Sequence, residues 1–145
     1  MKINIEVDRK SCDDVCDTLE AIVSNVHYGA RWATEIACKD IEEMSLMQVP
    51  RDTDTLASSI HHIVEKGRRR FVGTVYYGHG NPINPKSGEP VQNYMVRQHE
   101  DLEYFHVVGK AKFLEDPCRE YANSDKYAEL MAEAARRAIA RKARR

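Results

Sequence analysis

Two aspartates stand one residue apart in the stretch VPRDTDTLASSI, residues 49–60, together with two threonines and two serines. Carboxylates spaced like Asp52 and Asp54 can begin a calcium loop, but such a loop also needs further oxygen ligands and a glycine at fixed positions. The TLASSI that follows does not supply that set. Short polar side chains also bond the free backbone groups where a helix ends and a strand begins. We therefore expect this cluster to connect two structural elements and not to bind a metal.

Histidine is a frequent metal ligand, and the chain has six histidines. His61 and His62 are adjacent in an expected strand, so their side chains point to opposite faces and cannot easily share one ion. No two histidines have a recognised ligand spacing, and the four cysteines match no zinc motif. We expect the cysteines to be reduced and mostly buried, and we predict no metal or cofactor. The residues considered are His27, His61, His62, His79, His99, His106, Cys12, Cys16, Cys38 and Cys118.

Motifs for catalysis are also incomplete. Gly109-Lys110 is similar to the end of a phosphate-binding loop, but the upstream glycine is missing and no serine or threonine follows. The sequence contains no nucleophile elbow, paired-carboxylate signature or Gly-rich dinucleotide turn. These observations favour a protein that is not an enzyme and that acts through its surfaces.

The composition is typical of an ordinary globular domain, with 145 residues, 42% hydrophobic and 31% charged residues and a formal net charge of -1. No apolar run approaches the ~18 residues that span a bilayer. The first ten residues, MKINIEVDRK, contain no apolar signal core. We expect one domain over residues 1–145 that folds where it is synthesised and has no membrane contact.

The first half of the chain predicts a strand and then a long helix. Apolar and polar residues alternate in KINIEV, residues 2–7, as in a half-buried strand. Ser11, with Asp14 three residues later, is typical of a helix start, and Pro50 ends the helix. A domain of this size rarely covers a helix of roughly 50 Å by itself, so we expect part of its apolar stripe to pack on a neighbouring copy. That stripe consists of Val15, Leu19, Ile22, Val26, Ala30, Ala33, Ala37, Ile41 and Met44.

A hairpin and a loop are predicted next. ASSIHHIVEK and FVGTVYY have the composition of two strands, joined at the basic turn GRRR. The Gly/Pro-rich loop of residues 78–93 is longer than a plain hairpin connection, which indicates a function of its own. YMVRQHE, residues 94–100, is interpreted as a further strand.

Two helix starts follow, and they complete the fold prediction. Asp116 and Pro117 are a typical cap and first helical residue, and Ser124 begins the C-terminal helix. That helix carries Tyr127, Leu130, Met131, Ala134, Ala135 and Ala138 on one face. The fold class is therefore α+β: a small antiparallel β-sheet packed against one long amphipathic helix, with a C-terminal helix, in the order β-α-β-β-β-α.

Charge is distributed unevenly along the chain. Residues 1–50 carry ten acids and five bases, whereas the basic tail, residues 136–145, carries six bases and no acid. Such a tail indicates a polyanion or an acidic protein as partner. A solvated helix end is the alternative, because the helix dipole also favours cations there. The candidate contacts with DNA or an acidic partner are Arg68, Arg69, Arg70, Arg136, Arg137, Arg141, Lys142, Arg144 and Arg145.

Two stretches resemble the minor head–tail joining proteins of long-tailed double-stranded DNA bacteriophages, which are also called neck, tail-completion or minor capsid proteins. The family usually has glycine where this chain has Asp54, which implies a backbone φ above zero that aspartate tolerates better than most residues. The first motif, the junction after the long helix, is Pro50, Asp52, Thr53, Leu56, Ser59 and Ile60. The second motif is His99, Glu100, Gly109, Lys110, Ala111, Lys112, Phe113, Leu114, Glu115 and Pro117.

The resemblance implies a structural virion protein that forms a ring, expected to be six-fold, where the capsid portal meets the tail. Its partners would be copies of itself, an adaptor or head-closure ring, and the tail terminator or tail tube. Non-specific contact with double-stranded DNA in the channel is a further expectation. The protein would be made in the host cytoplasm and end in the virion neck. We expect the 78–93 loop and residues 100–112 to contact other neck proteins.

Two alternatives stay open from the sequence. A tail terminator that caps the tail tube is a close variant of the first interpretation. A nucleic-acid-binding regulator or metal-dependent nuclease belongs to a different class, and the basic tail and the scattered His and Asp residues favour it. Loss of activity on substitution of His61, His62 or His106 would support that second class.

Overall fold

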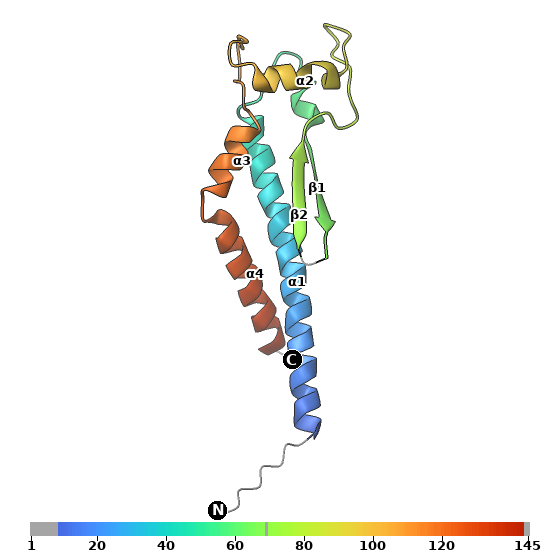
Figure 1. Ribbon diagram of the computed structural model, residues 1–145, viewed down its shortest axis with the longest axis vertical. Coiled ribbons are helices and arrows are strands. Elements are labelled where there is room, and N and C mark those ends of the chain that lie inside the picture. Colours follow the sequence, from blue (N-terminus) through green and yellow to red (C-terminus); the bar gives the residue numbers. More distant parts are fainter. Residues whose placement is uncertain (1–8, 69, 144–145) are drawn as a thin grey trace, which may run out of the picture.

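A single long helix, α1 (Arg9–Leu46), forms the axis of the molecule in the computed structural model, which describes residues 9–68 and 70–143 (Figure 1). Its 38 residues confirm the long helix predicted from the apolar stripe. Arg9 and Lys10 are already helical, so Ser11 lies inside the helix and the start predicted there is wrong. The stop before Pro50 is confirmed, because the chain leaves the helix after Leu46.

The predicted hairpin is confirmed over residues 61–76, but residues 57–59, which were expected in its first strand, form a 3-10 turn. β1 (His61–Lys66) and β2 (Phe71–Tyr76) pair antiparallel, with His61 opposite Tyr76 and Lys66 opposite Phe71. The hairpin packs closely on α1, since a Cβ at Gly73 would lie 2.4 Å from Cys38 Sγ. The α+β class with an antiparallel sheet therefore holds, although the strand expected over residues 2–7 lies outside the described residues.

The third expected strand is wrong, because residues 94–100 belong to the helix α2 (Val91–Glu100). Pro90 caps this helix in an extended conformation, and Val91 is fully buried. Tyr94, Met95 and Gln98 are half-buried, which completes a helical spacing. The stretch that was predicted as a strand begins at Tyr94 and so excludes Val91, the residue that reveals the helical spacing of the buried positions. The last three residues of the expected 78–93 loop are helical for the same reason.

Two further helices complete the chain, α3 (Glu115–Ala122) and α4 (Lys126–Ala143), after the 3-10 turn η1 (Ala57–Ser59) and α2. Asp116 and Pro117 lie in the first turn of α3, and its cap residue is Leu114, which contradicts the predicted cap at Asp116. Proline is tolerated there because the first backbone N–H groups of a helix have no partner within it. α4 runs back along one side of α1, and the hairpin lies on another side (Figure 1).

The hydrophobic core lies at the end of the molecule where α1 stops, and we call this end the head (Figure 1). Side chains from α1, the junction, β2, α2 and the segment before α3 meet there. The core residues are Val49, Leu56, Ala57, Tyr77, Val91 and Phe113. The opposite, amino-terminal end of α1 extends beyond the other elements.

The cysteines divide between core and surface. Cys38 is buried and Cys118 is half-buried, as expected, whereas Cys12 and Cys16 are exposed, which contradicts the prediction for that pair. Both exposed thiols lie in the first turns of α1, beyond the hairpin. None of the helices in the described residues combines the length and the apolarity needed to cross a membrane.

Candidate functional site

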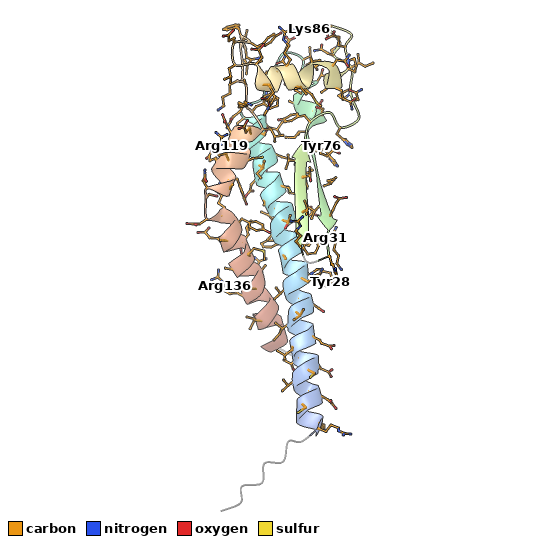
Figure 2. All side chains as sticks on the ribbon, in the orientation of Figure 1. Tyr28, Arg31, Tyr76, Lys86, Arg119 and Arg136 are labelled. Carbon is orange, nitrogen blue, oxygen red and sulfur yellow. The ribbon has the colours of Figure 1, made fainter. Side chains whose placement is uncertain are left out.

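The two aspartates of the junction pair with different cations. Asp52 forms an ion pair with Lys86, and Asp54 Oδ1 lies 3.3 Å from the guanidinium of Arg51. Within residues 9–68 and 70–143, no three His, Cys, Asp or Glu side chains are grouped so that they could hold a metal ion. Asp52 therefore connects the junction to the loop that carries Lys86 at the head (Figure 2), whereas Asp54 pairs within the junction.

Ser59 fixes the junction to the end of β2. Its fully buried Oγ donates a hydrogen bond to the carbonyl of Leu56 at 2.7 Å and accepts one from the backbone N–H of Gly78 at 3.1 Å. Its carbonyl accepts a further bond from the N–H of His79 at 2.9 Å. The polar residues of this motif thus satisfy backbone groups that would otherwise be buried without partners.

Asp54 has a backbone φ of 56°, the left-handed conformation inferred from the glycine that the resembled family usually has there. We expect Asp54→Gly to keep the free energy of unfolding within about 0.5 kcal/mol, because the exposed Arg51 pair contributes little and glycine adopts this φ without strain. Asp54→Val is expected to lower it by about 2 kcal/mol, since a β-branched residue is strained at positive φ. Urea unfolding of both variants measures the difference, and equal losses would contradict it.

The second motif forms a network of charged side chains between α2 and α3. Lys112 pairs with Glu100 and with Glu115, whose Oε2 lies 2.9 Å from Nζ, and Lys110 pairs with Asp116. The hydrogen bond from Lys112 is the main reason that the pKa of Glu100 is lowered and the pKa of Lys112 is raised. These groups are solvated, so the network orients the segment and stabilises it only weakly.

His99 connects the network to the core. Its Nε2 accepts a hydrogen bond from the backbone N–H of Glu115 at 3.2 Å, so Nδ1 carries the proton and donates to Glu100 Oε1 at 2.7 Å. The ring also contacts the edge of Phe113, with centroids 4.9 Å apart. The imidazole therefore positions the start of α3 and is not directed toward a reactive group.

The two motifs, far apart in the chain, pack directly on each other. Gly109 has a φ of 88°, and a Cβ there would lie 2.6 Å from the backbone of Val49 and Pro50. The N–H of Lys110 donates to the carbonyl of Gln48 at 2.9 Å. Phe113 then enters the same core as Leu56 of the first motif. The motifs therefore form one structural unit at the head.

A buried hydrogen-bonded chain extends from α1 through this unit. Ser45 Oγ donates to the carbonyl of Phe113 at 2.7 Å, so its remaining bond, to Tyr77 at 2.7 Å, must be accepted from the phenol. Burial raises the pKa of Tyr77 to about 12, although the hydrogen bond to Ser45 acts in the opposite direction. The folded protein therefore favours the neutral form of the Tyr77 phenol over its ionised form.

This pKa predicts a loss of stability in alkali. A raised pKa means that the stabilisation is complete below the ordinary tyrosine pKa of about 10 and is lost as the pH rises through about 12. Tyr121, whose pKa burial also raises to about 12, contributes in the same range. We expect Tyr77→Phe to be less stable at neutral pH but to lose less stability between about pH 8 and about pH 11. Urea unfolding at both pH values, with exposed Tyr104→Phe as control, tests this.

A hollow of about 390 Å³ opens beside this unit at the head. Its walls are the junction segment 50–56, the loop segment 84–89 and the segment 104–108, with Tyr94 and Gln98 of α2. Asp52 and Asp54 of the junction both lie on this wall. His106, also on the wall, has a buried Nε2 that forms no hydrogen bond with any described residue.

Large exposed apolar side chains line the hollow or lie next to its lining segments in the chain. Phe105 is 83% exposed, Val107 is 88% exposed and Leu102 is 76% exposed, and Ile83 of the facing loop is also exposed. Exposed apolar side chains that cluster around a hollow are typical of a protein-binding surface. We call the segments 83–89 and 102–108, with the hollow between them, the head surface.

The candidate basic contacts whose side chains the structure describes lie away from the head surface. Arg68 and Arg70 are exposed at the hairpin turn, and Arg136 is exposed on α4 (Figure 2). Arg137 pairs with Glu133 and lies 5.0 Å from the ring of Trp32. Arg141 and Lys142 belong to α4, but their side chains are not described, and Arg69, Arg144 and Arg145 lie outside the described residues.

No protein-family model, curated protein or solved structure matches this chain. The molecule is thus described by its fold, an α+β arrangement with a long helix, and by its head surface. From the sequence, residues 78–93 and 100–112 were predicted to contact other proteins, but the exposed apolar side chains of the head surface were not identified. A signal was present, since LEYFHVV, residues 102–108, is rich in apolar residues yet follows neither a helical nor a strand period.

Proposed function

We propose that this chain is a structural protein of the neck of a long-tailed bacteriophage, a member of the head–tail joining family that its two motifs resemble. In this proposal its copies form a ring around the DNA channel between the capsid portal and the tail. The protein performs no reaction, and its function is adhesion between its own copies and neighbouring rings.

The observation that carries the proposal is the contact between the two motifs. Gly109 lies against the backbone of Val49 and Pro50, and Phe113 packs into the core with Leu56. Residues that are far apart in the sequence therefore build one unit, as expected if both motifs belong to the same structural design. The unit holds the head surface at the end of a long rod.

The head surface is the part that we assign to a neighbouring neck protein. Its apolar side chains on 102–108 supply non-directional contact area, and Asp52, Lys86 and Glu89 at the hollow supply polar contacts that fix orientation. A ring presents this surface once per copy, so weak individual contacts add up around the circle.

Deletion of the gene from the phage that encodes it would test the proposed neck function. Deletion is expected to yield DNA-filled heads and separate tails of normal length in electron micrographs of the lysate. Overlong tails would instead identify a tail terminator, because an uncapped tube continues to grow. Normal infectious particles would overturn the proposal.

Surface variants test the assigned role of the head. We expect Phe105→Ser with Val107→Ser to fold normally but not to restore joined particles to the deletion phage, because each lost side chain removes about 1.5–3 kcal/mol of apolar contact. Ile63→Ser with Val72→Ser is the matched control, since both residues are exposed apolar positions on the hairpin. Circular dichroism and plaque counts of both pairs are the measurements. Equal restoration by both would exclude the head surface as the contact.

A further inference from the structure

The amino-terminal half of α1, residues 9–26, has an apolar face without cover. Val15, Leu19 and Val23 follow one another at four-residue steps and are 57%, 56% and 67% exposed. In the upper half of the helix the same stripe is buried at Ala33 and Ala37. The stripe therefore continues beyond the elements that cover it within the described chain.

An acidic face lies beside this apolar face. Asp13, Asp17 and Glu20 are spaced four and three residues apart, so they share one side of the helix. Further along α1 the same side reaches His27 and Glu35, which contact Phe71 and His62 of the hairpin. The hairpin ends at that level (Figure 1), and none of its own described side chains forms an ion pair with the three acids.

The end of α4 has the complementary properties. Ile139 is 57% exposed and Arg136 is exposed, three residues apart on the last turns of the helix. The basic tail that begins at Arg136 carries six bases and no acid. The end of α4 therefore combines an exposed aliphatic side chain with bases, and the first half of α1 combines exposed aliphatic side chains with acids. The two surfaces are complementary in charge, and both offer apolar contact area.

The two surfaces lie at the same height along the rod. Thr34 Oγ1 lies 3.3 Å from Tyr127 Oη, and a Cβ at Gly29 would lie 2.7 Å from Ala134 Cβ, so α4 runs antiparallel to α1. Continuing this register places the end of α4 level with Glu20. Two copies side by side in the same orientation would therefore bring the end of one α4 to the level of Leu19, Glu20 and Val23 of the next copy.

We infer that the amino-terminal half of α1 binds the C-terminal end of α4 from a second copy of this chain. The contact repeats the antiparallel helix pairing that α1 and α4 already form within one copy. It joins two different surfaces, so each copy keeps one of each for its other neighbour, and a ring forms when the rotation between neighbours closes the circle. The inference rests on the proposed function, because it supplies the subunit interface of the proposed ring.

Crosslinking between two proteins that each carry one introduced cysteine tests this interface. In a background with Cys12→Ser and Cys16→Ser, one protein carries Val23→Cys and the other carries Ile139→Cys. We expect a short bismaleimide to give a dimer on a denaturing gel only when the two proteins are mixed. The double-mass product must join different chains, which excludes pairing within one copy. The background protein alone reports any reaction of Cys38 or Cys118.

Other crosslinking results overturn the interface. A dimer from Val23→Cys alone would indicate symmetric packing of α1 on α1, and no dimer in the mixture would contradict any contact at this level. A closed ring measured by sedimentation without the mixed crosslink would reject this interface and leave the proposed function intact. Normal phage particles from the deletion strain would reject the proposed function, whatever the crosslinking shows.

Charge reversal supplies an independent readout. Asp13→Lys, Asp17→Lys and Glu20→Lys together are expected to reduce the mixed crosslink at least tenfold at low salt. They replace the acidic face with bases, and the C-terminal segment of the partner copy carries six bases and no acid. The matched control reverses three other exposed acids with Glu65→Lys, Glu120→Lys and Glu129→Lys. An equal reduction by both sets would show a general charge effect and contradict the assignment.

Discussion

Replacement of Phe113 by alanine is expected to lower the free energy of unfolding by about 3–5 kcal/mol. Phe113 is 1% exposed and contacts Tyr77 edge to face, with ring centroids 5.0 Å apart. Its removal leaves a cavity between the two motifs that neither backbone can fill, because His99 and Ser45 hold the segment in place by hydrogen bonds. Urea unfolding followed by circular dichroism measures the loss.

The control for this variant is Phe105→Ala, at a phenylalanine that is 83% exposed. We expect it to change the free energy of unfolding by less than about 0.5 kcal/mol, as is usual for surface sites. A similar loss from both variants would contradict the location of the core at the head. The same pair separates stability from function, because Phe105 belongs to the head surface and Phe113 does not.

Gly109→Ala is expected to cost about 2–4 kcal/mol, from strain at positive φ and from steric overlap. The φ of 88° is unfavourable for any residue with a Cβ, and that Cβ would lie 2.6 Å from the backbone atoms of Val49 and Pro50. These backbone atoms cannot move aside as a flexible side chain can, so the added Cβ must push the two motifs apart. Chemical unfolding and the thermal midpoint report the loss.

Gly88→Ala is the matched control, because Gly88 also has a positive φ, 73°, but a Cβ there would meet no atom within 4 Å. It is expected to cost only the backbone strain, about 1 kcal/mol. A loss at Gly109 no larger than the loss at Gly88 would show that the motifs do not pack as closely as described.

The features that could be predicted from the sequence are those that depend on neighbours in the chain. The period of the apolar stripe predicts α1, and β-branched runs around GRRR predict the hairpin. The left-handed backbone at Asp54 could be inferred because the choice of residue there reflects one local φ. Boundaries were less well predicted: Ser11 and Asp116 have the residue types of helix caps, yet both lie inside helices.

The tertiary structure alone decided which residues share the head. Residues 94–100 form a helix because Val91, outside the window considered, is buried against the core, and burial outweighs a weak local preference. The pairing of Asp52 with Lys86 and the contact of Gly109 with Val49 join segments far apart in the chain, so no local pattern specifies them. Exposure is likewise a property of the whole fold. The apolar residues at 102–108 and in the first turns of α1 are exposed because no other element of the described chain reaches them.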